Sequence, residues 1–155
     1  MLKGCILMNK DEAIKLNNQL CFSIYSLSRE INKLYRPFLE ELNLTYTQYL
    51  VMLVLWEKES YTMRDLGDSL FLDSGTLSPV IKRLTERELT YRKRDPEDER
   101  RVLISLTDNG KQLKEIAADI PAKLIKKSGL SEEKFSKTLF DFTNLLQQIQ
   151  DANSE

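Results

Sequence analysis

Two short amphipathic segments that follow each other closely constrain the fold of this 155-residue chain more than any other feature. Thr62 and Asp65 form a helix-capping pattern ahead of an apolar stripe, which predicts a short helix ending between residues 70 and 72. After about three residues a second helix begins, capped by Asp73 or Ser74. Its inward-facing positions are Leu77, Val80, Ile81 and Leu84. Two short helices at this separation predict a helix-turn-helix, whose second helix contacts DNA.

A β-hairpin is expected directly after these helices. Residues 89–94 and 102–106 are rich in strand-forming types and flank the charged loop at 95–101. The pattern predicts two antiparallel strands with a protruding charged tip, the wing of a winged helix.

Helices with one apolar face lie on the N-terminal side. A stripe at helical spacing predicts a helix from Asp11 to Tyr35. The stripe consists of Leu16, Leu20, Ile24, Leu27, Ile31 and Leu34. Pro37 lacks a backbone N–H, so we expect the helix to end there. Thr45 caps the next helix, which contains the run 49–56; this run is apolar nearly all round and predicts the central core helix.

Two further amphipathic helices are expected on the C-terminal side. Thr107 caps the first, which runs through Lys127 with a bend at Pro121, and Ser131 caps the second. The second has the apolar stripe Phe135, Leu139, Phe142, Leu145, Leu146 and Ile149. A small winged-helix core cannot cover these stripes together with the N-terminal one. We therefore expect a two-fold homodimer that buries them between two copies.

The expected fold is mainly α with a small β-hairpin wing: a winged helix-turn-helix with N- and C-terminal dimerisation helices. We expect a single domain spanning residues 1–155. Within it, residues 1–40 and 108–155 form the dimerisation helices, and residues 41–107 form the DNA-binding part.

The absence of histidine narrows the function classes. It removes the usual general base, the histidine-dependent nucleophile pairs and most zinc sites, so we expect neither an enzyme nor a metal or cofactor. The net charge is only −1, but the distribution of charge matters more for DNA binding than its sum. Basic residues cluster at Lys82, Arg83, Arg87, Arg92, Lys93, Arg94, Arg100 and Arg101. This cluster indicates double-stranded DNA as a partner.

A membrane location is not expected. The longest apolar run, residues 49–56, is far shorter than the roughly 18 to 20 residues of a membrane-spanning helix. Lys3 precedes only a short apolar stretch, without the long apolar region and cleavage site of a signal peptide. We therefore expect a cytoplasmic protein.

Four segments carry a resemblance to a known family. The stretch DERRVLISLTDNG at 98–110 resembles the wing signature of the MarR family of bacterial transcription regulators. The segments NQLCF at 18–22, LTYTQYLVMLVLWE at 44–57 and LDSGTLSP at 72–79 resemble its organic-hydroperoxide-resistance regulators. The resemblance extends from about residue 17 to residue 146, which covers most of the chain.

The resemblance implies a regulator, which we expect to be a repressor, that is released from its operator by oxidation of one thiol. The reactive cysteine of the family corresponds to Cys21, and its thiol-contacting tyrosines correspond to Tyr35 and Tyr46. An organic hydroperoxide would oxidise the thiol, and a low-molecular-weight thiol would then react with it. This chain lacks the C-terminal resolving cysteine of two-cysteine members, so it resembles the one-cysteine type unless Cys5 serves instead. We expect Cys5 to be incidental, and translation from Met8 would delete it.

The spacing of these residues restricts their geometry. Judged from its neighbours alone, Cys21 fits a small core residue, and its reactive role comes from the resemblance. Tyr35 lies 14 residues after Cys21, which is about 21 Å along a straight helix that rises about 1.5 Å per residue. If a tyrosine hydroxyl stabilises the thiolate, it should therefore come from the partner subunit.

The resemblance also implies that the second helix of the motif enters the major groove, and the wing the minor groove, of a palindromic operator. Hydroxyl groups at the start of this helix also fit simple capping roles, but Pro79 inside its first turns breaks a local rule, as functional surfaces often do. We expect Arg100 to be the inserted wing residue, oriented by Asp98. The candidate DNA-binding residues are Asp73, Ser74, Thr76, Ser78, Pro79, Lys82, Arg83, Arg94, Asp98, Arg100 and Arg101.

Two alternatives remain open. A regulator of the same fold could instead bind a lipophilic ligand and use Cys21 only for packing; thiol titration at neutral pH separates these cases. A cysteine peroxidase is disfavoured by the wing and by the lack of a thioredoxin-like βαβ pattern.

Overall fold

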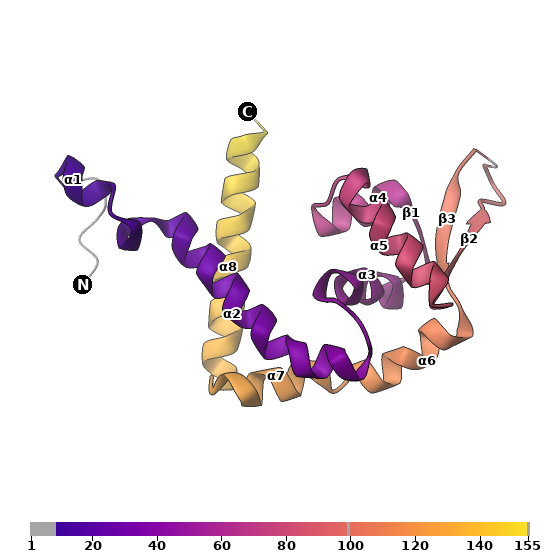
Figure 1. Cartoon of the computed structure of the whole chain (residues 1–155). Coiled ribbons are helices and arrows are strands. Elements are labelled where there is room, and N and C mark those ends of the chain that lie inside the picture. Colours follow the sequence, from indigo (N-terminus) through magenta and orange to yellow (C-terminus); the bar gives the residue numbers. More distant parts are fainter. Residues whose placement is uncertain (1–8, 99, 155) are drawn as a thin grey trace. The chain divides into compact units, whose positions relative to one another are not determined.

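A computed structural model describes residues 9–98 and 100–154 of the chain (Figure 1). Cys5 and Met8, considered above, lie outside the described residues. The chain forms two compact units that divide after Tyr46, and each is described by itself below. No helix within the described ranges is long and apolar enough to cross a membrane.

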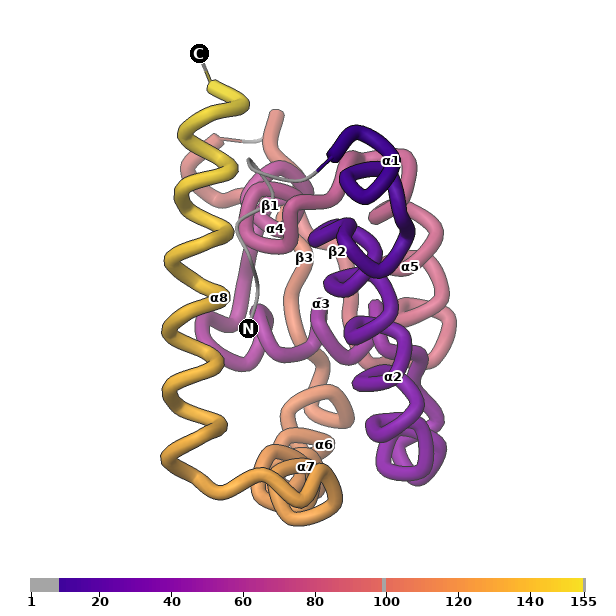
Figure 2. The backbone as a smooth tube through the Cα atoms, turned by 90° about the vertical axis from the view of Figure 1, so that its left-hand side faces the viewer, coloured from indigo at the N-terminus to yellow at the C-terminus, as the bar shows by residue number. Residues whose placement is uncertain are grey.

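The N-terminal unit begins with two short helical segments and not with the long helix expected from Asp11. Helix α1 spans Lys10–Ala13, the 3-10 helix η2 spans Leu16–Asn18, and α2 begins only at Leu20 (Figure 2). The side-chain amide of Asn18 donates to the carbonyl oxygen of Glu12 at 2.7 Å, and that of Gln19 donates to the carbonyl oxygen of Ala13 at 2.6 Å. These side-chain bonds satisfy backbone carbonyl groups without a continuous helix. The predicted start of the long helix at Asp11 was therefore wrong.

Helix α2 spans Leu20–Glu41 and passes through Pro37, where the sequence predicted its end. Proline removes one helical hydrogen bond, but its fixed φ is compatible with a helix. Continuing the helix buries Leu39, which is only 3% exposed, and this burial offsets the loss. The chain then turns at Asn43, which has a φ of 52°, and the N–H of Leu44 donates to the carbonyl oxygen of Leu39 at 2.9 Å.

The C-terminal unit contains the predicted helix-turn-helix. Helix α3 spans Tyr46–Glu57 and carries core side chains; α4 spans Met63–Leu70 and α5 spans Ser74–Glu86. Thr62 caps α4 by accepting from the N–H of Asp65 at 3.1 Å. Asp73, and not Ser74, caps α5. The largest fully buried apolar side chains of the unit are Tyr49, Val51, Met52, Leu55, Leu66, Leu77, Ile81, Leu84 and Ile104.

The wing is part of a three-stranded antiparallel sheet. Strand β2 spans Thr90–Arg94 and β3 spans Val102–Leu106, with Thr90 opposite Leu106 and Arg94 opposite Val102. Strand β1, which spans Ser60–Thr62, was not predicted from the sequence. It pairs with the other edge of β3, so the strand order is β1-β3-β2. Three residues are too few to show strand periodicity.

The helix expected from Thr107 to Lys127 is two helices. Helix α6 spans Asp108–Ala117 and α7 spans Ile120–Ser128, with a break at residues 118–119. Pro121 lies in the first turn of α7, where its missing N–H removes no helical bond, so it starts a helix and does not bend one.

Helix α8 spans Glu132–Asn153, capped by Ser131 as predicted, and forms one continuous helix (Figure 2). None of its described residues is buried. Its exposed apolar side chains are Leu139, Phe140, Phe142, Leu146 and Ile149.

Trp56 fastens the end of α3 to α6. Its indole N–H donates to the carbonyl oxygen of Gly110 at 2.9 Å, and Lys114 Nζ donates to the carbonyl oxygen of Trp56 at the same distance. A Cβ at Gly110 would lie 2.1 Å from the carbonyl oxygen of Leu89, so only glycine fits there. Leu89 leads directly into β2, and the base of the wing is thereby held against α6.

Candidate nucleic-acid interface and thiol site

The exposed face of α5 carries most of the candidate contacts predicted from the sequence. Ser74, Thr76, Ser78, Pro79, Lys82 and Arg83 are all exposed. The Thr76 hydroxyl donates to Asp73 Oδ2 at 2.9 Å, and the Ser78 hydroxyl donates to the carbonyl oxygen of Ser74 at 2.6 Å. These two hydroxyls therefore have structural partners within α5 and its cap while remaining open to solvent, so a structural role and a contact role are compatible for both.

Asp73 fixes the start of α5. Its Oδ1 accepts from the backbone N–H of Thr76 at 2.8 Å. This bond, followed by that from the Thr76 hydroxyl, lowers the pKa of Asp73 from its ordinary value. The carboxylate thus remains charged and holds the first turn, which presents its side chains outward.

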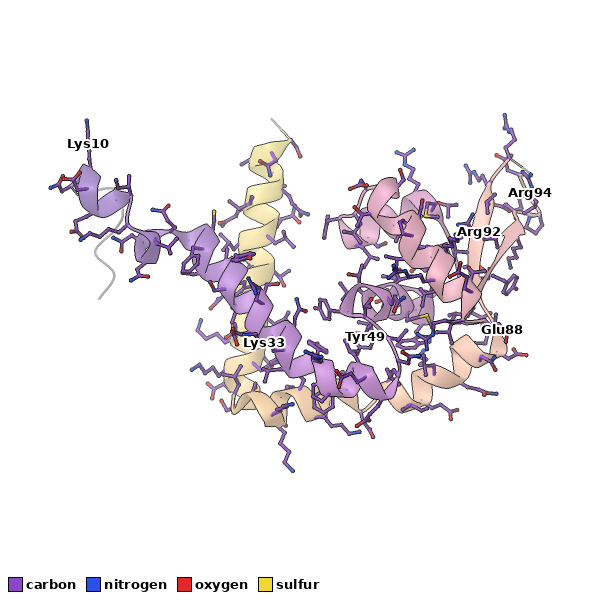
Figure 3. All side chains as sticks on the ribbon, viewed as in Figure 1. Lys10, Lys33, Tyr49, Glu88, Arg92 and Arg94 are labelled. Carbon is purple, nitrogen blue, oxygen red and sulfur yellow. The ribbon has the colours of Figure 1, made fainter. Side chains whose placement is uncertain are left out.

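A groove of about 660 Å³ runs along the outer face of α5 beside β2. It is lined by Gly75, Ser78, Pro79, Lys82, Thr85 and Glu86 of α5 and by Arg92 of β2. Arg92 and Arg94 both lie on the wing strand (Figure 3). The sequence analysis placed Arg92 in the basic cluster but not among the contacts, and it missed Thr85 and Glu86. The helical spacing 75, 78, 82 and 86 was a signal that could have identified the α5 side.

At the tip of the wing, Asp98 holds two arginines. Its Oδ1 accepts from Nε of Arg100 at 3.1 Å, and its Oδ2 lies 3.6 Å from Nε of Arg101. The side-chain hydrogen bond from Arg100 is the main cause of a lowered pKa at Asp98, with a further contribution from the charge of Arg101. The Arg100 side chain remains 92% exposed. A guanidinium oriented in this way and open to solvent can enter a narrow minor groove.

Cys21 lies in the first turn of α2 and is exposed within a single chain. It is therefore not part of the core of its own chain. Amide dipoles at a helix N-terminus favour negative charge nearby. Tyr25 lies one turn further along the same face, and its hydroxyl accepts from Arg29 Nη1 at 3.0 Å. The sequence analysis did not single out Tyr25, although the i, i+4 spacing from Cys21 was visible.

Tyr35 and Tyr46 form a pair. Their ring centroids lie 5.1 Å apart at an interplanar angle of 52°. Burial raises the pKa of the Tyr46 hydroxyl. Because Cys21 and Tyr35 lie on one continuous helix, they are about 21 Å apart along its axis. Within one chain, the thiol and the tyrosine pair therefore do not meet.

The family model described as "Transcriptional regulator SarA/Rot" matches residues 33–116. The chain is 48% identical over 143 residues to an organic hydroperoxide resistance transcriptional regulator of Bacillus subtilis, an alignment that covers 90% of this chain and 97% of the relative. These relatives are transcription regulators and not enzymes.

Solved structures give a similar result. AbfR of Staphylococcus epidermidis, solved in reduced form bound to DNA, has a TM-score of 0.77, 37% identity and coverage of 93% of this chain and 99% of AbfR. AbfR has also been solved overoxidised and bound to DNA, with a TM-score of 0.73, 38% identity and the same coverage. Reduced MarR of E. coli has a TM-score of 0.68 and 23% identity, covering 83% of this chain and 96% of MarR, and shows a shared fold.

Proposed function

The chain belongs to the MarR/SarA family of winged-helix, DNA-binding transcriptional regulators, and from this we propose that it is a repressor that senses organic hydroperoxides or related oxidants through Cys21. The observation that carries the proposal is the exposed thiol in the first turn of α2, in a chain 48% identical to an organic hydroperoxide resistance regulator. A protein that acts on DNA in this way works in the cytoplasm.

The DNA-binding part of the proposal rests on α5 and the wing. The first turn of α5 is fixed by Asp73 and faces solvent, as a helix that enters the major groove requires. Arg100 extends from the wing, oriented by Asp98, as a minor-groove contact requires. A homodimer would carry these elements twice and bind a palindromic operator. The exposed apolar side chains of α8 supply a surface for that association.

The sensing chemistry starts from the Cys21 thiolate. The sulfur attacks one oxygen of the hydroperoxide, the O–O bond breaks, and the departing alkoxide takes a proton to become an alcohol. The sulfur is left as sulfenic acid, oxidised by two electrons. A low-molecular-weight thiol then attacks this sulfur and releases water, which gives a mixed disulfide.

The tyrosine pair of the second copy would complete the site. Two phenol hydroxyls that donate hydrogen bonds to the sulfur would stabilise the thiolate. A phenol keeps its proton at neutral pH and can donate, and burial, which raises the pKa of Tyr46, favours this protonated form further. The 14-residue separation of Cys21 and Tyr35 on α2 supports assembly of this site across a dimer.

Release from DNA would follow from the size of the adduct. A mixed disulfide at a packed interface displaces the tyrosines and shifts the helices that set the distance between the two winged units. The structure of AbfR described as overoxidised and bound to DNA supports bulk, and not oxidation as such, as the cause of release. Small changes in spacing suffice because both half-sites must be contacted together.

A gel-shift experiment tests the proposal. The wild type and Cys21→Ser are titrated against the DNA upstream of the chain's own gene, with and without cumene hydroperoxide and a small thiol. Cys21→Ser should bind like the wild type and ignore the peroxide, whereas Cys5→Ser should still respond. If Cys21→Ser leaves the DNA at the same peroxide dose as the wild type, the sensing role of Cys21 is wrong.

A further inference from the structure

The groove beside α5 contains charges of both signs. Lys82 and Glu86 lie on α5, and Arg92 faces them from β2. Two cations on opposite sides of one groove suit a phosphodiester strand, which is a line of negative charge. Glu86 also lines this groove, and its negatively charged carboxylate repels a phosphodiester strand.

Helix stability does not account for Glu86. It is the last residue of α5, where the carbonyl ends of the helix make a negative charge unfavourable. The two acidic residues that the sequence predicted among the DNA contacts have structural roles: Asp73 caps α5, and Asp98 holds Arg100. Glu86 has a different kind of contact: its Oε1 lies 3.8 Å from Lys82 Nζ.

The Lys82–Glu86 ion pair is too exposed to matter much for folding. The two side chains are 75% and 59% exposed, and pairs of this kind contribute little to stability. The pair instead affects the binding of charged groups that approach the groove from solvent. A phosphate that binds Lys82 competes with the Glu86 carboxylate for the ammonium group, and Glu86 then lies close to the bound phosphate.

We propose that Glu86 limits the affinity of this chain for DNA by competing with the phosphodiester backbone for Lys82 in the α5–β2 groove. This inference rests on the proposed DNA-binding function. The repulsion acts on phosphates and not on bases, so it weakens the binding of all duplexes alike. A repressor held less tightly is released more readily when its sensor is modified.

The test compares Glu86→Gln with the wild type on the operator duplex and on a scrambled duplex of the same length, across a range of salt concentrations. Glu86→Gln should bind both duplexes more tightly by a similar factor of about three to ten. The log–log salt dependence should steepen by about one unit for each protomer of the bound dimer. The melting temperature should not fall, because the removed charge lies at the unfavourable end of α5.

Glu40→Gln is the matched control. Glu40 pairs with Arg36 at 2.8 Å with the same i, i+4 spacing, but on α2 in the N-terminal unit. Its replacement should leave both affinities unchanged.

Three outcomes would contradict the inference. If the wild type binds the operator and Glu86→Gln binds both duplexes with unchanged affinity, the inference alone is wrong. If Glu86→Gln lowers the affinity for the operator and not for the scrambled duplex, Glu86 contacts a base. A carboxylate that accepts from the amino group of cytosine is the known geometry for such a contact. If the wild type binds neither duplex, the proposed function is wrong and the inference with it.

Discussion

The rings of Tyr35 and Tyr46 contact each other at a centroid distance of 5.1 Å, although one lies on α2 and the other begins α3. The turn between the two helices, which includes the left-handed residue Asn43, brings them together. The two phenols thus lie side by side, as the proposed contact with one sulfur of a second copy requires.

Removing either phenol hydroxyl should slow sensing. Tyr35→Phe and Tyr46→Phe keep the ring contact but lose a donor to the thiolate, so each variant should bind operator normally and release it more slowly after peroxide. Release is followed by the anisotropy of a labelled operator. Tyr61→Phe, on β1 with its ring near Lys58, is the control and should respond like the wild type. Equal release rates in all four proteins would remove the tyrosines from the sensor.

Arg100 and Lys82 should differ in the kind of affinity they provide. Arg100→Ala loses an oriented contact but uncovers no core, so operator binding should weaken substantially while the melting curve stays unchanged. Lys82→Ala should weaken binding to the operator and to the scrambled duplex alike, and it should reduce the salt slope by about one unit for each protomer of the bound dimer. Unchanged binding in both variants would mean that DNA contacts another surface.

Gly110→Ala should damage the base of the wing. The added Cβ would lie 2.1 Å from the backbone oxygen of Leu89, which cannot move without shifting β2. We expect a loss of about 1–3 kcal/mol in the free energy of unfolding, measured by urea denaturation. At Gly75, the nearest obstacle to a Cβ is a side-chain oxygen of Asp73 at 3.0 Å. Gly75→Ala should therefore change stability by no more than about 1 kcal/mol, and a similar loss at both sites would contradict the backbone clash.

The apolar face of α8 should hold two copies together. Sedimentation at micromolar concentration should show a species of twice 18.1 kDa. Leu146 is 47% exposed within one chain, and Leu146→Asp should give a helical protein of half that mass which no longer binds the operator. Gln148→Asp, on the same helix but outside the apolar stripe, should remain dimeric. A folded wild-type monomer at this concentration would contradict the dimer.

Sequence patterns that involve residues close together in the chain predicted the fold most reliably. Thr62, Thr107 and Ser131 were predicted as caps, and each accepts the expected backbone N–H, because capping involves residues only three positions apart. The wing strands were also predicted correctly. Strand β1 was missed because its partner Ser105 lies 45 residues from Ser60, and no local pattern reports such pairing.

The errors arose where tertiary burial or side-chain bonding outweighed a local rule. Pro37 did not end α2, since the next turn buries Leu39. Asn18 and Gln19 bond to earlier carbonyl groups and delay the start of that helix to Leu20. For the site, residue spacing indicated that Cys21 and Tyr35 are far apart in one chain. It did not indicate that Tyr35 and Tyr46 contact each other, because that depends on the turn at residues 42–45.

Trp56 is the one tryptophan in the sequence, and its indole N–H is hydrogen-bonded to Gly110 at the base of the wing. Indole emission depends on the polarity and hydrogen bonding around the ring, so the protein contains an optical reporter at this joint. Stopped-flow measurement of tryptophan emission after peroxide addition would therefore give the rate at which thiol oxidation changes the base of the wing, without any added label.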